Sequence, residues 1–143
     1  TITYKIKDMK KIIVSAIVAG GVLLILSVLG LYITIWFFPG LAEEYFAPAF
    51  NVSSSRYMIY FIHPFIISSA LAWFWERFKG LLTGSFITRG VEFGLIYAIV
   101  AIFPMMWMIY SAINVSLEMV ATWLVLGILQ GLITGLVFEK MNP

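Results

Sequence analysis

The chain has no cysteine and only one histidine, His63, among its 143 residues. Disulfides, thiolate metal sites and cysteine nucleophiles are therefore excluded, and a structural zinc site has too few ligands. Charged residues are also scarce, at 11% against the roughly 25% of soluble domains, while hydrophobic residues make up 62%. Such a chain cannot cover a globular surface with polar groups, so its composition is typical of a membrane protein.

Motifs of common enzyme and nucleic-acid-binding classes are missing as well. The sequence contains no GxSxG, no HExxH, no phosphate-binding glycine loop and no paired aspartates. Its basic residues are not interleaved with aromatic ones on a folded basic face, and they are placed to contact lipid head groups. We therefore expect neither an enzyme nor a nucleic-acid-binding protein, and we expect no resident cofactor or metal.

Four continuous apolar runs dominate the sequence, at residues 12–38, 57–75, 91–113 and 117–138. A helix needs about 20 residues to cross a bilayer, whereas strands of a barrel would alternate apolar and polar positions. The first run is much longer than the apolar part of a signal peptide, so we expect an uncleaved span. We predict an all-α integral membrane protein, one domain over residues 1–143, whose four transmembrane helices form two antiparallel hairpins. The connection at residues 39–56 predicts a short interfacial helix.

The basic residues are distributed unevenly between the two sides that these spans define. Arg56 alone lies between the first and second spans. The other eight flank the first span, lie between the second and third, or follow the fourth: Lys5, Lys7, Lys10, Lys11, Arg77, Lys79, Arg89 and Lys140. Because Lys and Arg mark the cytoplasmic side, both termini are expected there, as in a bacterial inner (plasma) membrane. Arg89 and Glu92, three positions apart, are expected to pair on one helix face.

Two short matches recur at a single offset of 63 residues. "AFNVS" at residues 49–53 returns as "AINVS" at 112–116, and "FWER" at 74–77 aligns with "VFEK" at 137–140. If the chain arose by duplication, its halves are parallel repeats. Matches of this length also arise by chance in an apolar alphabet, so both interpretations stay open.

Small residues recur at every fourth position of the last two spans. They are Gly90, Gly94 and Ala98 in the third span, and Gly127, Gly131 and Gly135 in the fourth. Such stripes let helix backbones approach closely inside a bilayer. The two stripes either face each other within the chain, or the second one forms an interface between copies.

The stretch "YFIHPFIISS", residues 60–69, contains the histidine with a proline directly after it. Pro64 has no N–H and displaces the carbonyl of Tyr60, and Pro104 does the same in the third span, so both positions predict kinks. Helical rise places His63 and Pro104 about 10 Å below the same surface. We predict a small outward polar pocket at this depth, with these candidate lining residues: His63, Glu118, Tyr60, Asn114 and Thr122. Gln130 and Thr134 are expected to form a separate inner pair.

Three roles are open to His63: a hydrogen bond to the kinked backbone, contact with a proton or solute, or axial ligation of a porphyrin-type pigment. The leading interpretation of the whole chain is a non-enzymatic subunit, either homo-oligomeric or accessory to a larger membrane complex. The first alternative is a small-solute or proton transporter or channel that uses the pocket around His63 and Glu118. The second is a pigment or haem carrier through His63.

Overall fold

Helices account for every element in the computed structural model, which describes residues 2–50 and 54–143. In chain order the elements are α1 (Ile2–Phe37), α2 (Pro39–Glu44), η1 (Pro48–Phe50), α3 (Ser54–Phe78), η2 (Lys79–Leu81), α4 (Phe86–Tyr97), η3 (Ala98–Ile102), α5 (Phe103–Ala112) and α6 (Leu117–Met141). Four segments are long and apolar enough to cross a membrane: Met9–Phe37, Arg56–Leu81, Phe86–Ala112 and Leu117–Met141. The prediction of an all-helical chain with four such segments is confirmed.

Local signals explain where several of these helices begin. Ser116 precedes α6 and its hydroxyl accepts a hydrogen bond from the N–H of Met119 at 3.1 Å, while Glu118 lies in the first turn. Ser85 caps α4 in the same way through the N–H of Thr88. These side chains satisfy backbone donors that a helix start leaves unpaired, and the acidic residue complements the helix dipole.

The two prolines predicted to kink helices have different surroundings. Pro64 lies inside α3, which continues past it. Pro104 follows η3, a π-helical turn in which the N–H of Phe103 bonds to the carbonyl of Ala98, five residues back. A π turn changes the hydrogen-bond register just where a proline cannot donate, so the helix continues despite the missing N–H. The sequence indicates an irregularity at Pro104 but not its π geometry.

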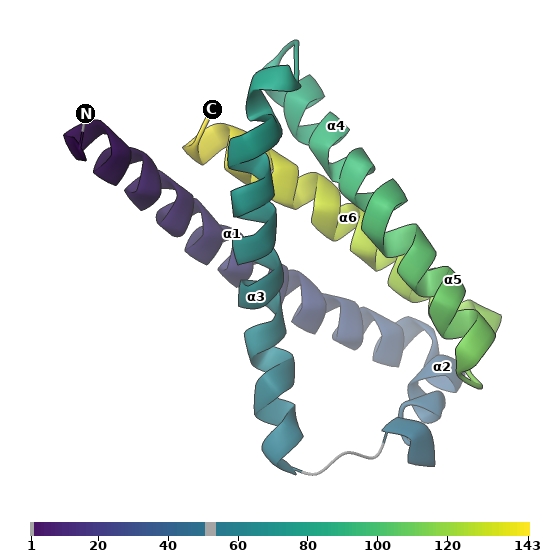
Figure 1. The fold of residues 1–143 in the computed structure, drawn as a ribbon. Helices are drawn as coiled ribbons and strands as arrows, with labels where there is room; N and C mark the ends of the chain where they lie inside the picture. Colours follow the sequence, from purple (N-terminus) through teal and green to yellow (C-terminus); the bar gives the residue numbers. More distant parts are fainter. Residues whose placement is uncertain (1, 51–53) are drawn as a thin grey trace.

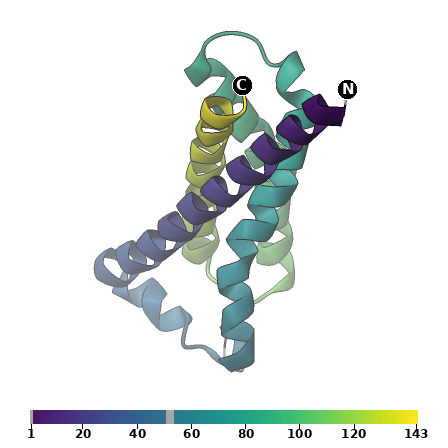
Figure 2. The ribbon, with the colours of Figure 1, turned by 90° about the vertical axis from the view of Figure 1, so that its left-hand side faces the viewer.

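The helices pack as two contacting pairs, α1 with α3 and α4 with α6, and α1 also contacts α6 (Figure 1). Both ends of the described chain and the α3–α4 connection lie at one end of the bundle, here called the termini end (Figure 2). The short α2 and the connection from α5 to α6 lie at the opposite end, here called the α2 end.

Small residues line both close contacts between helices. A Cβ on Gly94 would lie 2.6 Å from the Cα of Leu132, and one on Gly135 would overlap the carbonyl of Gly90. In the other pair, a Cβ on Gly20 of α1 would lie 2.9 Å from the hydroxyl of Ser68 on α3. Such contacts let the backbones approach where lipid removes the hydrophobic drive. The glycines of the two predicted stripes at 90, 94, 131 and 135 therefore meet inside the chain, while Gly127 faces Ile102 and Ala98 is buried.

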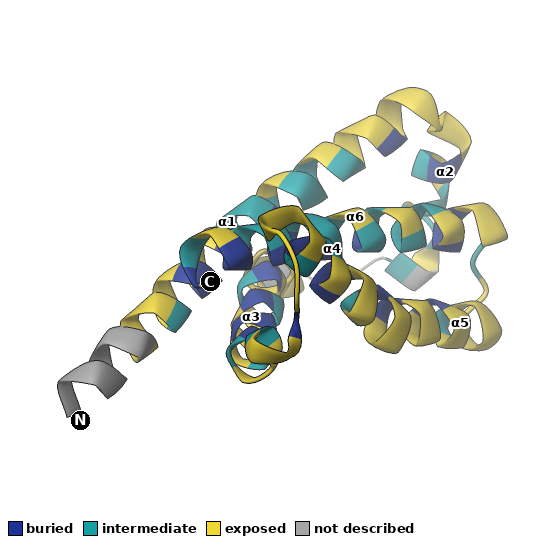
Figure 3. Ribbon diagram, turned by 90° about the horizontal axis from the view of Figure 1, so that it is seen from above, coloured by how far each residue is buried: buried dark blue, intermediate teal, exposed yellow. Residues whose placement is uncertain are grey.

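Three aromatic side chains fill the bundle near the termini end. Trp75, Phe93 and Phe138 are at most 1% exposed, and their ring centroids lie 5.1–6.2 Å apart. Most of the arrangement is edge to face, which suits the charge distribution of aromatic rings. Figure 3 shows buried residues concentrated where α1, α3, α4 and α6 cross, whereas α5 is largely exposed. We call Trp75, Phe93 and Phe138 the aromatic plug.

The lengths of α3 and α6 match the offset of the sequence repeat. α3 covers Ser54–Phe78 and α6 covers Leu117–Met141, so each starts and ends 63 positions from the other. Trp75 and Phe138 thereby occupy equivalent positions and contact each other within the plug. Residues 51–53 of the "AFNVS" match lie outside the described residues.

Candidate functional site

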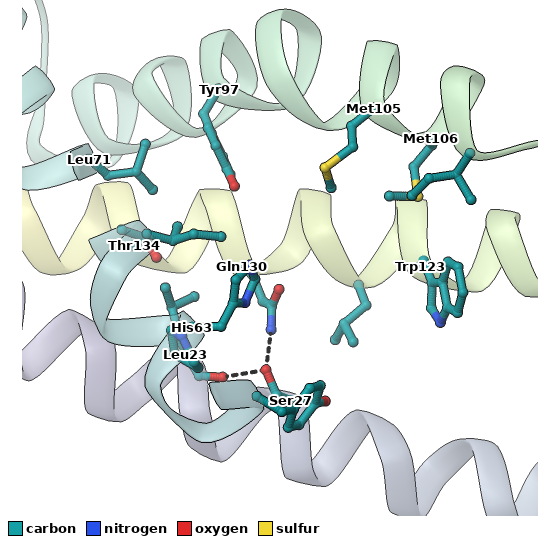
Figure 4. A pocket seen from close by; sticks show the side chains of 15 residues that line it. Leu23, Ser27, His63, Leu71, Tyr97, Met105, Met106, Trp123, Gln130 and Thr134 are labelled. Atoms are coloured by element: carbon teal, nitrogen blue, oxygen red, sulfur yellow. Dashed lines mark hydrogen bonds between the residues drawn. The ribbon is translucent and has the colours of Figure 1, made fainter. Parts of the chain in front are cut away.

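A cavity of about 300 Å³ lies among the four long segments (Figure 4). Its apolar lining residues are Leu23, Pro64, Ile67, Leu71, Met105, Met106, Ile109, Trp123 and Leu126. Its polar lining residues are Ser27, Tyr60, His63, Tyr97, Gln130 and Thr134. We call it the central cavity. An apolar hollow with a few converging polar groups is the usual form of a small-molecule site.

A short hydrogen-bonded chain crosses the cavity from α6 to α1. The amide nitrogen of Gln130 donates to the hydroxyl of Ser27 at 3.0 Å, and that hydroxyl donates to the carbonyl of Leu23 at 2.9 Å (Figure 4). The amide oxygen of Gln130 takes no part in this bond and can accept another. The chain fixes the orientation of Gln130 inside the cavity.

Thr134 contributes a hydroxyl that its surroundings leave unpaired. The residue is 1% exposed, lines the cavity, and its Oγ1 has no hydrogen-bond partner among the described residues. Other helical threonines donate to the carbonyl four residues back, as Thr34 does to Gly30 and Thr122 to Glu118, both at 2.9 Å. Because burying an unpaired hydroxyl costs about 1–3 kcal/mol, Thr134 has the features of a group reserved for a ligand.

The mouth of the cavity lies between α3 and α5. Tyr60 is 54% exposed, Met105 is 43% exposed, and His63 is also exposed, although all three line the cavity. Counting residues along the helices at 1.5 Å each places these positions about 10 Å from the α2 end of their spans. At that depth, an opening between two spans faces the side of the bundle.

Aromatic side chains lie at both ends of the cavity. At the α2 end, the indole N–H of Trp123 donates to the Tyr45 hydroxyl at 2.6 Å, and Phe50 packs edge-on against the same indole. At the other end, the lining residue Leu71 belongs to the same buried cluster as the aromatic plug. The central cavity thus lies between two groups of packed aromatic residues.

The predicted pocket residues fall into two groups. Tyr60 and His63 line the central cavity, where they meet Gln130 and Thr134 instead of being separate from them. Glu118 and Asn114 are exposed near the start of α6 and do not line it. Thr122 lines a different hollow, beside Gly30 of α1.

Helical phase explains this division. The residues of α6 that line the central cavity recur every three or four positions: Trp123, Leu126, Gln130 and Thr134. At about 100° per residue, Trp123, Leu126 and Thr134 lie within about 40° of Gln130 around the helix, whereas Thr122 lies about 80° and Glu118 about 120° away. Ser27 was missed from the sequence; the available signal was a polar group in the middle of an apolar run, whose cost inside a membrane makes it a functional candidate.

A polar network at the termini end joins three helices. Arg89 pairs with Glu139 at 2.7 Å, not with the predicted Glu92, and also donates to the carbonyl of Lys79 at 3.1 Å. Asn142 accepts from Trp75 and Lys79 and donates to Glu76. Because Glu139 comes from α6 and Arg89 from α4, the correction follows from the tight packing of these helices. The network ties the last residues of the chain to the α3–α4 connection.

No group of three or more metal-ligating side chains occurs among residues 2–50 and 54–143. Comparison with protein-family models, with curated proteins and with solved structures gives no match. What the protein does must follow from the chemistry of its central cavity and from its surface.

Proposed function

We propose that this protein is a non-enzymatic integral membrane protein that binds a small molecule in the central cavity. The unpaired, buried hydroxyl of Thr134 carries the proposal, because it is the one feature of the lining that an occupant would stabilise. Gln130 and His63 add further hydrogen-bonding groups to the same cavity. No pair of carboxylates lines it, so a general acid and base for catalysis would have to come from elsewhere.

The proposed setting is a bacterial inner membrane crossed by two antiparallel hairpins with cytoplasmic termini. The uneven distribution of basic residues supports this orientation, with only Arg56 on the opposite side. The matching bounds of α3 and α6 support the further proposal that the hairpins are parallel repeats. In this orientation the mouth of the cavity lies in the outer half of the bilayer.

Binding is favoured over conduction of protons or solutes. A conducting path needs access from both sides, and the aromatic plug fills the bundle between Thr134 and the termini end. The lining also contains no Asp, Glu, Lys or Arg, the groups that mark ion and proton paths inside membranes. The outward pocket is thus better suited to holding a molecule than to passing one.

The dimensions of the cavity argue against a porphyrin-type pigment on His63. Along α6 its lining runs from Trp123 to Thr134, about 16 Å at 1.5 Å per residue. The volume of about 300 Å³ is at the lower end of the range for small-molecule pockets, so an elongated, narrow ligand suits it better than a large planar ring system.

The test is restoration of stability by lipid. Protein stripped by prolonged washing in detergent should gain thermal stability when a native lipid extract is added back, because a ligand at 100 times its Kd stabilises by about 2.7 kcal/mol. Ser27→Leu, whose larger side chain fills part of the cavity, should show no such gain while keeping its helix content. An equal gain in both proteins would refute binding in the cavity, and an absorption band above about 380 nm in unstripped protein would instead favour the pigment carrier.

A second candidate is a subunit, homo-oligomeric or accessory, of a larger membrane complex. Six successive residues of α3, from Tyr57 to Ile62, are between 47% and 66% exposed. Six residues cover more than one turn, so this segment of the helix is exposed on most sides, although Tyr60 also lines the central cavity. An exposed segment of a transmembrane helix is a natural place for a partner helix.

Cysteine cross-linking in native membranes tests this second candidate. The chain has no cysteine, so single substitutions at Met58 or Ile59 report only on their own neighbours. A cross-linked band at twice the monomer mass would identify a second copy, and other masses would identify different chains. If only the monomer band is seen with cysteine at each position from 57 to 62, lipid covers this segment of α3.

A further inference from the structure

We infer that the occupant of the central cavity is an uncharged, chain-like molecule from the bilayer whose polar end is a hydroxyl group. The inference rests on the proposed function and names the ligand class of the same cavity. Four observations support it: the charge of the lining, the order of its polar and apolar residues, its hydrogen-bonding groups and the position of the mouth.

Charge disfavours an ionised ligand. The lining contains no Asp, Glu, Lys or Arg, and its one histidine, His63, is exposed at the mouth. A carboxylate or ammonium brought to Gln130 and Thr134 would lose its water without gaining an opposite charge from any of these four residue types, which is strongly unfavourable. The nearest ion pair, Arg89 with Glu139, lies beyond the aromatic plug, where the two side chains are bonded to each other at 2.7 Å.

The lining changes character along α5 and α6. Toward the termini end α6 presents Gln130 and Thr134, and toward the α2 end these helices present Met106, Ile109 and Trp123. The polar Tyr60 and His63 of α3 lie at the mouth. Figure 4 shows Gln130 and Thr134 on one part of α6, and Met105, Met106 and Trp123 farther along the cavity. A ligand matched to this order has a polar end near Thr134 and an apolar chain that reaches toward Trp123.

Hydrogen bonding favours a neutral group that both donates and accepts, such as a hydroxyl, over one that only accepts. Gln130 uses its amide nitrogen on Ser27, so its amide oxygen is left to accept, while the Thr134 hydroxyl can donate. Residues four apart on a helix have Cβ atoms about 6 Å from each other, so one oxygen between them can contact both. A hydroxyl donates to Gln130 and accepts from Thr134, whereas a ketone can only accept.

The mouth of the cavity opens where such a molecule would be found. Its rim is formed by Tyr60 and His63 on α3 and by Met105 on α5. These residues lie about 10 Å from the α2 end of their spans, at a depth occupied by lipid chains and not by bulk water. A chain-like molecule can therefore enter sideways from the bilayer.

Photolabelling of the full chain in proteoliposomes tests the ligand class. Three ten-carbon probes that carry a diazirine on the chain would be compared: a primary alcohol, an alkane and a carboxylate. We expect the alcohol alone to label cavity residues of α5 and α6 saturably, in competition with unlabelled 1-decanol. Thr134→Val should lower this labelling about tenfold, as expected for the loss of one hydrogen bond in a buried site.

Matched variants separate hydrogen-bond chemistry from folding. Thr134→Ser keeps the hydroxyl and should retain the labelling, and Thr122→Val makes the same change as Thr134→Val on α6 outside the cavity and should have no effect. Equal labelling by the alkane, saturable labelling by the carboxylate, or loss of labelling in Thr134→Ser would overturn the hydroxyl inference while leaving a ligand cavity. Absence of cavity labelling by all three probes would overturn the inference, and lipid add-back would then decide separately whether the cavity binds anything.

Discussion

At the residue scale, the buried hydroxyl of Thr134 lowers the stability of the empty protein and is proposed to bind the ligand. Its buried hydroxyl has no partner among the described residues, so Thr134→Val should stabilise the stripped protein by about 1 kcal/mol. Thr122→Val is the matched control, because the Thr122 hydroxyl already donates to the carbonyl of Glu118. Unfolding of both variants in detergent measures the difference, and a clear loss of stability in Thr134→Val would show that its hydroxyl has a partner in the folded protein.

The ion pair between Arg89 and Glu139 gives a second prediction at this scale. The two side chains are 19% and 6% exposed, and removing one partner leaves a buried charge uncompensated. Glu139→Gln should therefore destabilise the protein by about 3 kcal/mol or more. The double variant Arg89→Met with Glu139→Met should recover most of that loss, because it removes both charges together. Equal destabilisation by the single and double changes would mean that the hydrogen bonds of Arg89 to other groups dominate.

His63 gives a third prediction, of a small effect. The residue is exposed at the mouth of the cavity, so His63→Gln should change stability by no more than about 0.5 kcal/mol. An amide keeps a donor and an acceptor, so ligand retention should survive the change. If His63→Gln abolishes retention in protein that is still folded, the histidine itself is a ligand-binding group.

At the element scale, the close contact of α4 with α6 is the most sensitive feature to substitution. A Cβ on Gly135 would overlap the carbonyl of Gly90, which is backbone and cannot move aside alone. Gly135→Ala should cost about 1–3 kcal/mol from overpacking. Gly21→Ala is the control, because a Cβ there meets no atom within 4 Å. Similar thermal stabilities for the two variants would contradict the close packing of α4 on α6.

The number and helical type of the membrane spans were predictable from the sequence. Which faces of these helices contact one another was only partly predictable. Long apolar runs give four spans, and Pro104 marks an irregular position, because both depend on the local chain. The set of side chains that meet Gln130 depends on which face of each helix turns inward, and that is decided by tertiary packing. The sequence prediction placed Glu118 with His63 because it used only their depth in the membrane. The direction in which Glu118 leaves its helix places it outside the central cavity.

The π turn η3 and the pairing of Arg89 with Glu139 show the same limit. Pro104 marks a break in regular hydrogen bonding, but several local geometries would satisfy it. Arg89 has Glu92 one turn away in sequence, and the close packing of α4 on α6 brings it a better partner from 50 residues farther along. Contacts between helices were thus the information that the local sequence did not contain.

At the scale of the whole molecule, the arrangement of the ends gives a prediction of topology. The described chain ends and the α3–α4 connection lie at the termini end (Figure 2), which also holds most of the basic residues. Reporters fused after Pro143 or inserted near Thr83 should indicate the cytoplasm, and one inserted near Ser54 should indicate the outside. A C-terminal reporter on the outside would refute the orientation.

The central claim is that one molecule of the protein holds one small molecule within the bilayer. It is tested most directly by the mass of the protein released intact from native membranes, compared between the natural sequence and Ser27→Leu. The account predicts a single adduct of an uncharged molecule on the natural chain and the bare mass for Ser27→Leu, because the larger side chain occupies the cavity that Ser27 lines. A bare mass for the natural chain, or the same adduct on both proteins, would contradict it.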